Sequence, residues 1–424
     1  MRISELKKAV AADGFREQML MLYGAARYEE QKIRYQRILD RASELFGDAE
    51  ANLFSAPGRT EVGGNHTDHQ LGRVLAASID LDVAAVAVKT DDSFITYESD
   101  SFHVRPVDIS DISIQAAEKN TTESLIRGIA GGYIRKGLKA GGFKCYAESD
   151  VLPGSGMSSS AAFEILIAEI LNVFYNGGQV SPVLQAQVGQ YAENVYFGKA
   201  SGLMDQMACS VGGFITIDFA DKENPEVRKV PFDFDASGYD LILTDCRQSH
   251  ADLSDEYSLI PSEMLQVARF FNKEVLSQIT IDDLMDHAAE VRRACPDRAF
   301  MRAYHFLKET ERVKDEVKCL EDNDMKGFLQ KVTESGNSSY MYLQNVYPPA
   351  DSSHQSLAVG LAISEELLAG RGAWRVHGGG FAGTIQAFVP ADLAEAYVGK
   401  MEDVFGSGSC YVLRIRSAGG YLIG

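Results

Sequence analysis

The sequence predicts an α+β protein of two lobes with a ligand site between them. Helix-type and strand-type hydrophobic patterns are mixed along the chain, and glycine-rich polar segments separate them. The length of 424 residues corresponds to two or three domains of about 150 residues each. Apolar residues make up 45% of the chain, which is enough for a large core that needs no disulfide or metal.

The first part of the chain changes from helix to strand patterns and back. Residues 1–50 carry apolar side chains at helical spacing, and Gly47 is a suitable helix end. Runs rich in Val, Ile and other apolar residues predict strands at Val74–Val88, Phe94–Glu98 and Phe143–Glu148. Long apolar patterns predict helices at Ala161–Tyr175 and Pro182–Phe197.

The second part begins near Gly212–Gly213, where we expect a boundary. Short apolar runs predict strands at Phe214–Phe219 and Leu241–Thr244. Helices are expected over most of Pro261–Leu329. The glycines Gly378–Gly380 join two further strand candidates, Trp374–Val376 and Thr384–Val389.

Charge and composition exclude several classes of partner. The 41 basic and 60 acidic side chains give a net charge of −19, which repels nucleic acid and anionic membranes. The six cysteines are far apart and form no C-x-x-C motif, which is typical of reduced thiols. Met1–Gly24 does not have the pattern of a signal peptide, and no apolar stretch approaches the ~20 residues of a membrane span. We expect a cytoplasmic protein without nucleic-acid or membrane partners.

The strongest motif is P-G-S-G-M-S-S-S-A-A at Pro153–Ala162. Its glycines allow close backbone approach, its serines supply hydroxyls, and a helix with unpaired N–H groups follows. This arrangement is typical of a phosphate site, although the lysine of a Walker A loop is missing. A flexible turn that only caps the helix is the alternative.

Three further segments are polar or rich in glycine. Ala56–Gln70 carries a dense polar set that could bind several hydroxyls, or could be an exposed loop. In Gly198–Gln206, Asp205 could orient or deprotonate a hydroxyl, or could be a helix-terminal residue. Glu193, taken alone, is expected at the surface, and His377–Gly383 is a weak glycine-rich signal.

Taken in chain order, these segments resemble the galactokinase family of the GHMP small-molecule kinase superfamily. Ala56–Gln70 is similar to G-R-x-N-L-I-G-E-H-T-D-Y, and the serine segment to P-x-G-x-G-L-S-S-S-A-A. The segment that ends at Gln206 resembles G-I-M-D-Q, and His377–Gly383 resembles T-G-G-G-F-G-G. His250–Tyr257 and Tyr304–Val313 resemble two further family motifs, H-x-L-x-x-x-E-Y and H-x-x-x-E-x-x-R-V.

The resemblance implies a two-lobed GHMP kinase architecture of mixed sheets and helices, with transfer of the ATP γ-phosphoryl group to the C1 hydroxyl of a hexose. The implied catalytic residues are Asp205 and Arg59. The implied sugar contacts are Arg59, Asn65, His66, Asp68, Gly202, Asp205 and Tyr257. The implied ATP contacts are Gly154, Ser155, Gly156, Met157, Ser158, Ser159 and Ser160. Ser160 and Glu193 would hold Mg²⁺.

The departures from the family pattern gather near the expected sugar site. Asn65 stands where the family usually has glutamate, His69 where it has tyrosine, and Glu61 where it has asparagine. Galactose is the first candidate substrate, and a modified hexose such as galacturonate or an N-acetylated amino sugar is the alternative. A non-catalytic galactose sensor and a kinase for mevalonate or homoserine are less favoured.

The predicted organisation has three parts. Residues 1–50 form a helical N-terminal extension, residues 51–213 an N-terminal GHMP kinase domain, and residues 214–424 a C-terminal domain. We expect a monomer, with the extension packed on the N-terminal lobe.

Overall fold

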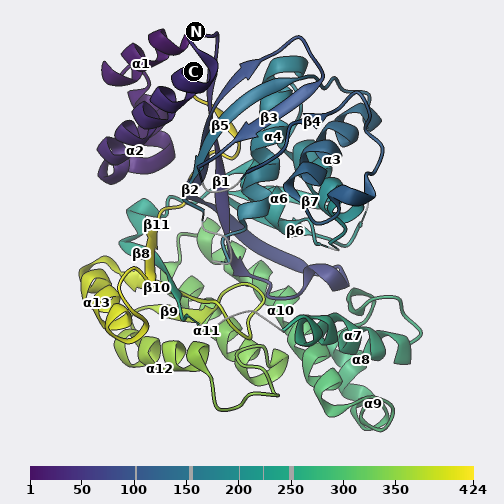
Figure 1. Cartoon of the computed structure of the whole chain (residues 1–424). Coiled ribbons are helices and arrows are strands. Elements are labelled where there is room, and N and C mark those ends of the chain that lie inside the picture. Colours follow the sequence, from purple (N-terminus) through teal and green to yellow (C-terminus); the bar gives the residue numbers. More distant parts are fainter. Residues whose placement is uncertain (101–102, 152–155, 200, 223, 248–252) are drawn as a thin grey trace.

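Two β-sheets, one in each lobe, organise the molecule (Figure 1). The structure is a computed structural model, and it describes the chain except residues 101–102, 152–155, 200, 223 and 248–252. The elements confirm the predicted α+β class.

The first lobe is built on an eight-stranded sheet. Its strands are β1 (Asn52–Gly63), β2 (Arg73–Lys89), β3 (Phe94–Glu98), β4 (Val107–Asp108), β5 (Phe143–Ser149), β6 (Phe214–Asp218), β7 (Glu226–Val230) and β12 (Tyr421–Leu422). The main order is β12-β1-β2-β5-β3-β4, while β6 also pairs with β2 and carries β7 at its other edge. Only the β3–β5 pairing is parallel among the described strands.

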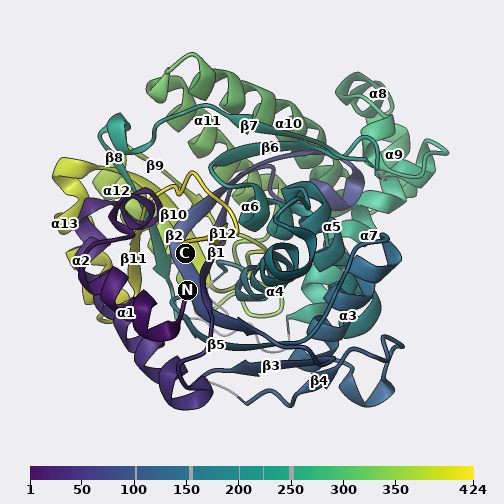
Figure 2. The same cartoon turned by 90° about the horizontal axis from the view of Figure 1, so that it is seen from above.

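Helices cover both faces of this sheet (Figure 2). One face carries α3 (Thr122–Arg135), α4 (Ser159–Asn176), α5 (Pro182–Tyr191) and α6 (Met204–Val211). A π-helical segment, Ala192–Phe197, continues α5. The opposite face carries α1 (Ile3–Ala11) and α2 (Arg16–Phe46). Residues such as Leu22, Ile38 and Leu39 are fully buried there, so the extension supplies one wall of the core.

The second lobe contains an antiparallel four-stranded sheet with the order β11-β8-β10-β9. Its strands are β8 (Tyr239–Asp245), β9 (Ala373–Val376), β10 (Thr384–Pro390) and β11 (Cys410–Leu413). Its helices are α7 (Ser254–Phe270), α8 (Ile281–Asp286), α9 (Ala288–Ala294), α10 (Asp297–Glu321), α11 (Met325–Ser338), α12 (Ser356–Leu368) and α13 (Ala394–Phe405). Short 3₁₀ turns lie at residues 68–70, 116–118, 235–237, 276–278 and 391–393, and a π-helical segment at Ser339–Leu343.

The predicted strands and long helices are confirmed, with Gly47 at the end of α2. The alternative of an exposed loop is wrong for the first part of Ala56–Gln70, because residues 56–63 belong to the buried strand β1. The three-part division of the chain stays a prediction. The first-lobe sheet itself crosses residue 213, since β6 pairs with β2, β7 pairs with β6, and β12 pairs with β1.

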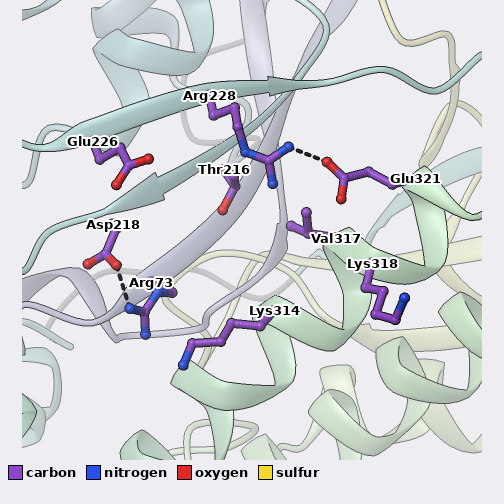
Figure 3. A pocket seen from close by; sticks show the side chains of 9 residues that line it. All are labelled: Arg73, Thr216, Asp218, Glu226, Arg228, Lys314, Val317, Lys318 and Glu321. Carbon is purple, nitrogen blue, oxygen red and sulfur yellow. Dashed lines mark hydrogen bonds and ion pairs between the residues drawn. The ribbon is translucent and has the colours of Figure 1, made fainter.

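A shallow pocket of about 250 Å³ lies where β6 and β7 meet α10 (Figure 3). Four basic side chains line it, and each has an acidic partner. The pairs are Arg73–Asp218, Arg228–Glu321, Lys314–Glu311 and Lys318–Asp322. The four basic side chains of this pocket are therefore neutralised by neighbouring carboxylates.

Two further expectations concern cysteines and membranes. All six cysteines are in the described part of the chain, and all are free. Within that part, no helix combines the length and apolar content needed to cross a bilayer.

Candidate active site

The Asp205 carboxylate, in the first turn of α6, is at the centre of the candidate site. Its Oδ1 accepts a hydrogen bond from Arg59 Nε of β1 at 2.7 Å, and its Oδ2 accepts one from Ser158 Oγ at 2.7 Å. Arg59 is buried, whereas 33% of the Asp205 side chain is exposed. The carboxylate is thus fixed on both oxygens and still accessible to a ligand.

Opposing effects set the pKa of Asp205. Burial raises it, but the charge of Arg59 and the hydrogen bonds from Arg59 and Ser158 lower it more, so the pKa lies below its ordinary value. Asp205 is therefore ionised at neutral pH. An ionised carboxylate can orient a hydroxyl and can accept its proton as the oxygen is phosphorylated.

The serine segment lies beside this pair. Arg59 donates through its backbone N to Met157 O at 3.0 Å and through its guanidinium to Gly156 O. Ser158 adopts a left-handed conformation with φ of 61°, and α4 begins at Ser159. The free N–H groups and the dipole at the start of this 18-residue helix suit a phosphate group.

Ser160 and Glu193 lie close together behind the segment. Ser160 Oγ is 3.5 Å from Glu193 Oε1, which also accepts from Lys199 Nζ at 3.0 Å. Gln206 Nε2 donates to the other Glu193 oxygen at 3.0 Å. The surface position expected for Glu193 alone is wrong: only 3% of the residue is exposed, because the π-helical turn points it inward among these partners.

This pair of oxygen donors fits Mg²⁺ only together with other ligands. A hydroxyl and one carboxylate suit a hard cation, and phosphate oxygens and water would complete its shell. Among the described residues, no group of three or more His, Cys, Asp or Glu could hold a metal. Metal binding here would therefore depend on the nucleotide.

Four predicted sugar contacts line one cavity of about 690 Å³ between the lobes: His66, Asp68, Gly202 and Tyr257. Asp68 Oδ2 lies so near Gly202 that a Cβ at position 202 would be 2.0 Å from it. Burial raises the pKa of Asp68, and the negative charge of Asp205 raises it further. Two carboxylates therefore face the same region, and only Asp205 has an arginine partner.

The glycine turn of the second lobe contacts two of the residues that line this cavity. His66 Nε2 is 2.9 Å from Gly379 O, and Tyr257 Oη donates to Gly380 O at 2.7 Å. The His377–Gly383 segment, a weak signal in sequence, is thus in contact with two predicted sugar residues. Burial lowers the pKa of His66 to about 4, so its imidazole is neutral.

Asn65 is fully buried. Its Nδ2 donates to Glu61 Oε1 at 2.8 Å and Gly378 O at 2.7 Å, and its Oδ1 accepts from Asn345 at 2.9 Å and Ser339 at 3.2 Å. These four bonds use the full capacity of the amide. A direct contact with a sugar would require one of them to break. In this arrangement Asn65 joins the first lobe to the second.

Several residues of the site were not found by sequence reasoning. Arg375 of β9 is fully buried and pairs with Glu61 at 3.0 Å, which neutralises the Glu61 carboxylate. A basic residue inside the apolar run Trp374–Val376 was the available signal. Lys199 and Gln206 lie in the same segment as Asp205 and hold Glu193. Two predicted phosphate contacts, Gly154 and Ser155, lie outside the described residues.

Two family models match the chain in the regions that build this site. The GHMP kinases N terminal domain matches residues 124–213, which include the serine segment and Asp205. The galactokinase galactose-binding signature matches residues 43–89, which include Arg59 and Asp68. The fold and site thus define a GHMP kinase.

Proteins of similar sequence show which family of GHMP kinases the chain belongs to. A galactokinase of Actinobacillus pleuropneumoniae serotype 5b is 30% identical over 361 residues, which cover 82% of this chain and 88% of that protein. The galactokinase of Streptomyces coelicolor is 27% identical over 382 residues, which cover 89% and 95%. The chain belongs to the galactokinase family of sugar phosphotransferases.

A solved structure agrees in fold. Lactococcus lactis galactokinase complexed with galactose superposes with a TM-score of 0.76 at 23% identity, covering 90% of this chain and 98% of that one. A Methanococcus jannaschii mevalonate kinase matches less closely, with a TM-score of 0.59 and 14% identity.

Proposed function

We propose that this protein transfers the γ-phosphoryl group of ATP to the C1 hydroxyl of a hexose, with D-galactose as the first candidate. The observation that carries the proposal is the double contact of Asp205. Arg59 and Ser158 hold its two oxygens, so the group that would receive the sugar hydroxyl is fixed to the segment that would receive the phosphates. Phosphoryl transfer depends chiefly on such positioning and on charge stabilisation.

Each part of the site has a role in this proposal. The sugar enters the cavity lined by His66, Asp68 and Tyr257, with its C1 hydroxyl at Asp205. The phosphates lie at the start of α4, and Arg59 offsets negative charge that develops between the two substrates. Ser160 and Glu193 would hold Mg²⁺, which neutralises phosphate charge when bound.

Galacturonate is the second candidate, because Asn65 is uncharged and the neighbouring Glu61 carboxylate has an arginine partner. Two carboxylates at 4 Å repel by about 4 kcal/mol at an effective dielectric constant of about 20. Position 65 carries an amide, and the nearby Glu61 carboxylate is paired with Arg375. A C6 carboxylate would therefore meet less repulsion than beside an unpaired glutamate.

The test is Mg²⁺-dependent ADP release with galactose and with galacturonate, measured side by side. We expect turnover of galactose, and a loss of about 10²-fold to 10⁴-fold in kcat for Asp205→Asn, the usual range for removal of a general base. Turnover of galacturonate alone would assign the second candidate. An unimpaired Asp205→Asn protein would exclude the role given to Asp205, and ATP-dependent turnover of mevalonate without any hexose would contradict the proposal.

A further inference from the structure

The N-terminal helices reach the phosphate segment from the opposite face of the sheet. Helix α2 packs on β2 and β5, while the segment Gly156–Ser160 leads into α4 on the other face (Figure 2). Directly after β5, Asp150 contacts α2 and Val151 lies against Gly58, so the chain crosses between the two faces here. Contacts at this crossing can connect α2 with the candidate active site.

Two arginines of α2 bind the Asp150 carboxylate. Arg34 Nη1 lies 2.9 Å and Arg27 Nη2 3.2 Å from Asp150 Oδ2. The backbone N of Asp150 also donates to Asp82 O at 2.9 Å. Asp150 is therefore held through both its main chain and its side chain. A backbone hydrogen bond alone would leave the side chain free to rotate.

The anchor beneath these contacts is a buried charge cluster. Asp82 is fully buried and pairs with Arg34 at 2.7 Å and with Arg416 at 3.4 Å. Burial raises the pKa of Asp82, but the two arginines lower it more, so the pKa stays below its ordinary value and the carboxylate remains charged. Tyr23 Oη of α2 donates to the same carboxylate at 2.5 Å. A buried cluster in which one carboxylate is bound by two arginines and a tyrosine resists rearrangement.

The crossing is in direct contact with the site. A Cβ at Gly58 would lie 3.2 Å from both methyl carbons of Val151 and 2.9 Å from Met157 O. The next residue, Arg59, donates to Met157 O and holds Asp205. A shift of Val151 would therefore press on the backbone that positions Arg59 and the phosphate segment.

We propose that Asp150, clamped by Arg27 and Arg34 of α2, is a positioning residue for nucleotide binding, so that the N-terminal extension is a working part of the ATP site. This inference rests on the proposed kinase function and goes beyond it, since it gives residues 1–50 a role in substrate affinity. Asp150 acts through Val151 and Gly58 and does not itself touch the nucleotide.

The test is calorimetric titration of the full chain with a non-hydrolysable ATP analogue, together with the KM values of both substrates. The variant is Asp150→Asn, which keeps the size of the side chain and removes its charge. The matched control is Glu148→Gln, which removes the Arg37–Glu148 ion pair between the same helix and strand β5 at 2.9 Å. Asp150 is 31% exposed, so the loss of its charge should leave the protein folded.

We expect Asp150→Asn to raise both the dissociation constant of the analogue and the KM for ATP by about 3-fold to 10-fold. The KM for the sugar and the Tm should stay near those of Glu148→Gln. Equal nucleotide affinity in the two variants would overturn the inference. A parallel rise in both KM values with a lower Tm would also overturn it, because that result indicates general loosening. If the unchanged protein binds no nucleotide, the proposed kinase function fails as well.

Discussion

Asp205 and Asp68 lie close enough for the charge of one to act on the other, yet their pKa values move in opposite directions. Burial acts on both in the same sense. The difference arises because Arg59 and Ser158 bond to Asp205, whereas Asp68 accepts a single described bond from the backbone of His69 and experiences the negative charge of Asp205. The bonds from Arg59 and Ser158 thus lower the pKa of Asp205, while burial and the charge of Asp205 raise that of Asp68.

This arrangement predicts a shift in the pH profile of Arg59→Gln. Without the guanidinium, burial of Asp205 is no longer offset, so its pKa rises. The carboxylate is then protonated at a higher pH, and the acid limb of kcat/KM against pH should move upward by about 1 to 3 pH units, the range for a paired charge. The measurement is the pH dependence of ADP release.

Arg73→Gln is the matched control for this shift. Arg73 pairs with Asp218 in the surface pocket of Figure 3, away from Asp205, and its loss should leave the acid limb in place. An acid limb that stays unchanged in Arg59→Gln would show that another group sets it.

At the scale of elements, glycine has opposite effects in two helices. Gly24 interrupts α2 with φ of 70° and ψ of 174°, and a Cβ there would lie 1.8 Å from Arg414 Nη1. Gly399 lies on the exposed side of α13, where a Cβ would point into open space. Gly24 is required because its backbone conformation and the adjacent Arg414 exclude a side chain. Gly399 has no such constraint and only weakens α13.

The two alanine variants should therefore change stability with opposite signs. Gly24→Ala should lower the free energy of unfolding by about 1 to 3 kcal/mol, from backbone strain and the clash with Arg414. Gly399→Ala should raise it by about 0.5 to 1 kcal/mol, because alanine favours the helix. Urea unfolding of the two proteins checks both signs. A stabilising effect of Gly24→Ala would contradict the claim that α2 requires a glycine at this position.

Sequence patterns predicted the elements that carry long apolar runs, such as β2 and α4, which are buried along most of their length. They did not predict β1, because its polar residues are buried against partners from the other lobe: Gln386 donates to Thr60, and Arg375 pairs with Glu61. They also missed the break at Gly24, since helical spacing continues on both sides of it.

The candidate site was likewise predicted from the sequence only in part. Motif resemblance placed Arg59, Asp205 and the serine segment in one site, and the structure brings them within hydrogen-bonding distance. The position of Asn65 could not be predicted, because Ser339 and Asn345, which donate to it from the second lobe, lie 274 and 280 residues further along the chain. Such contacts follow from the packing of lobes, which no local pattern encodes.

At the scale of the whole molecule, stability depends on a carboxyl group buried where the lobes meet. Glu316 of α10 is fully buried beside Gly63 of β1, and neither of its oxygens has a hydrogen-bond partner among the described residues. Burial, together with the nearby charge of Glu309, raises its pKa well above the ordinary value of 4.5. The folded protein therefore keeps this proton at pH values where the unfolded chain has lost it.

This difference makes the free energy of unfolding fall as pH rises above 4.5, because the unfolded chain then binds fewer protons than the folded protein. The decrease is up to about 1.4 kcal/mol for each pH unit below the folded pKa. Glu316→Gln removes the titrating group. An unsatisfied amide in its place carries its own cost, but that cost does not change with pH.

The stability of Glu316→Gln relative to the parent protein should therefore increase as pH rises from 4.5 toward the folded pKa of Glu316, whatever its sign at the lower limit. Urea unfolding at intervals of one pH unit measures this difference. Glu311→Gln, on the exposed side of the same helix, is the control and should show a much smaller trend. A difference that does not depend on pH would mean that Glu316 is charged in the folded protein, and the contact between α10 and β1 would then need a cation or water to stabilise it.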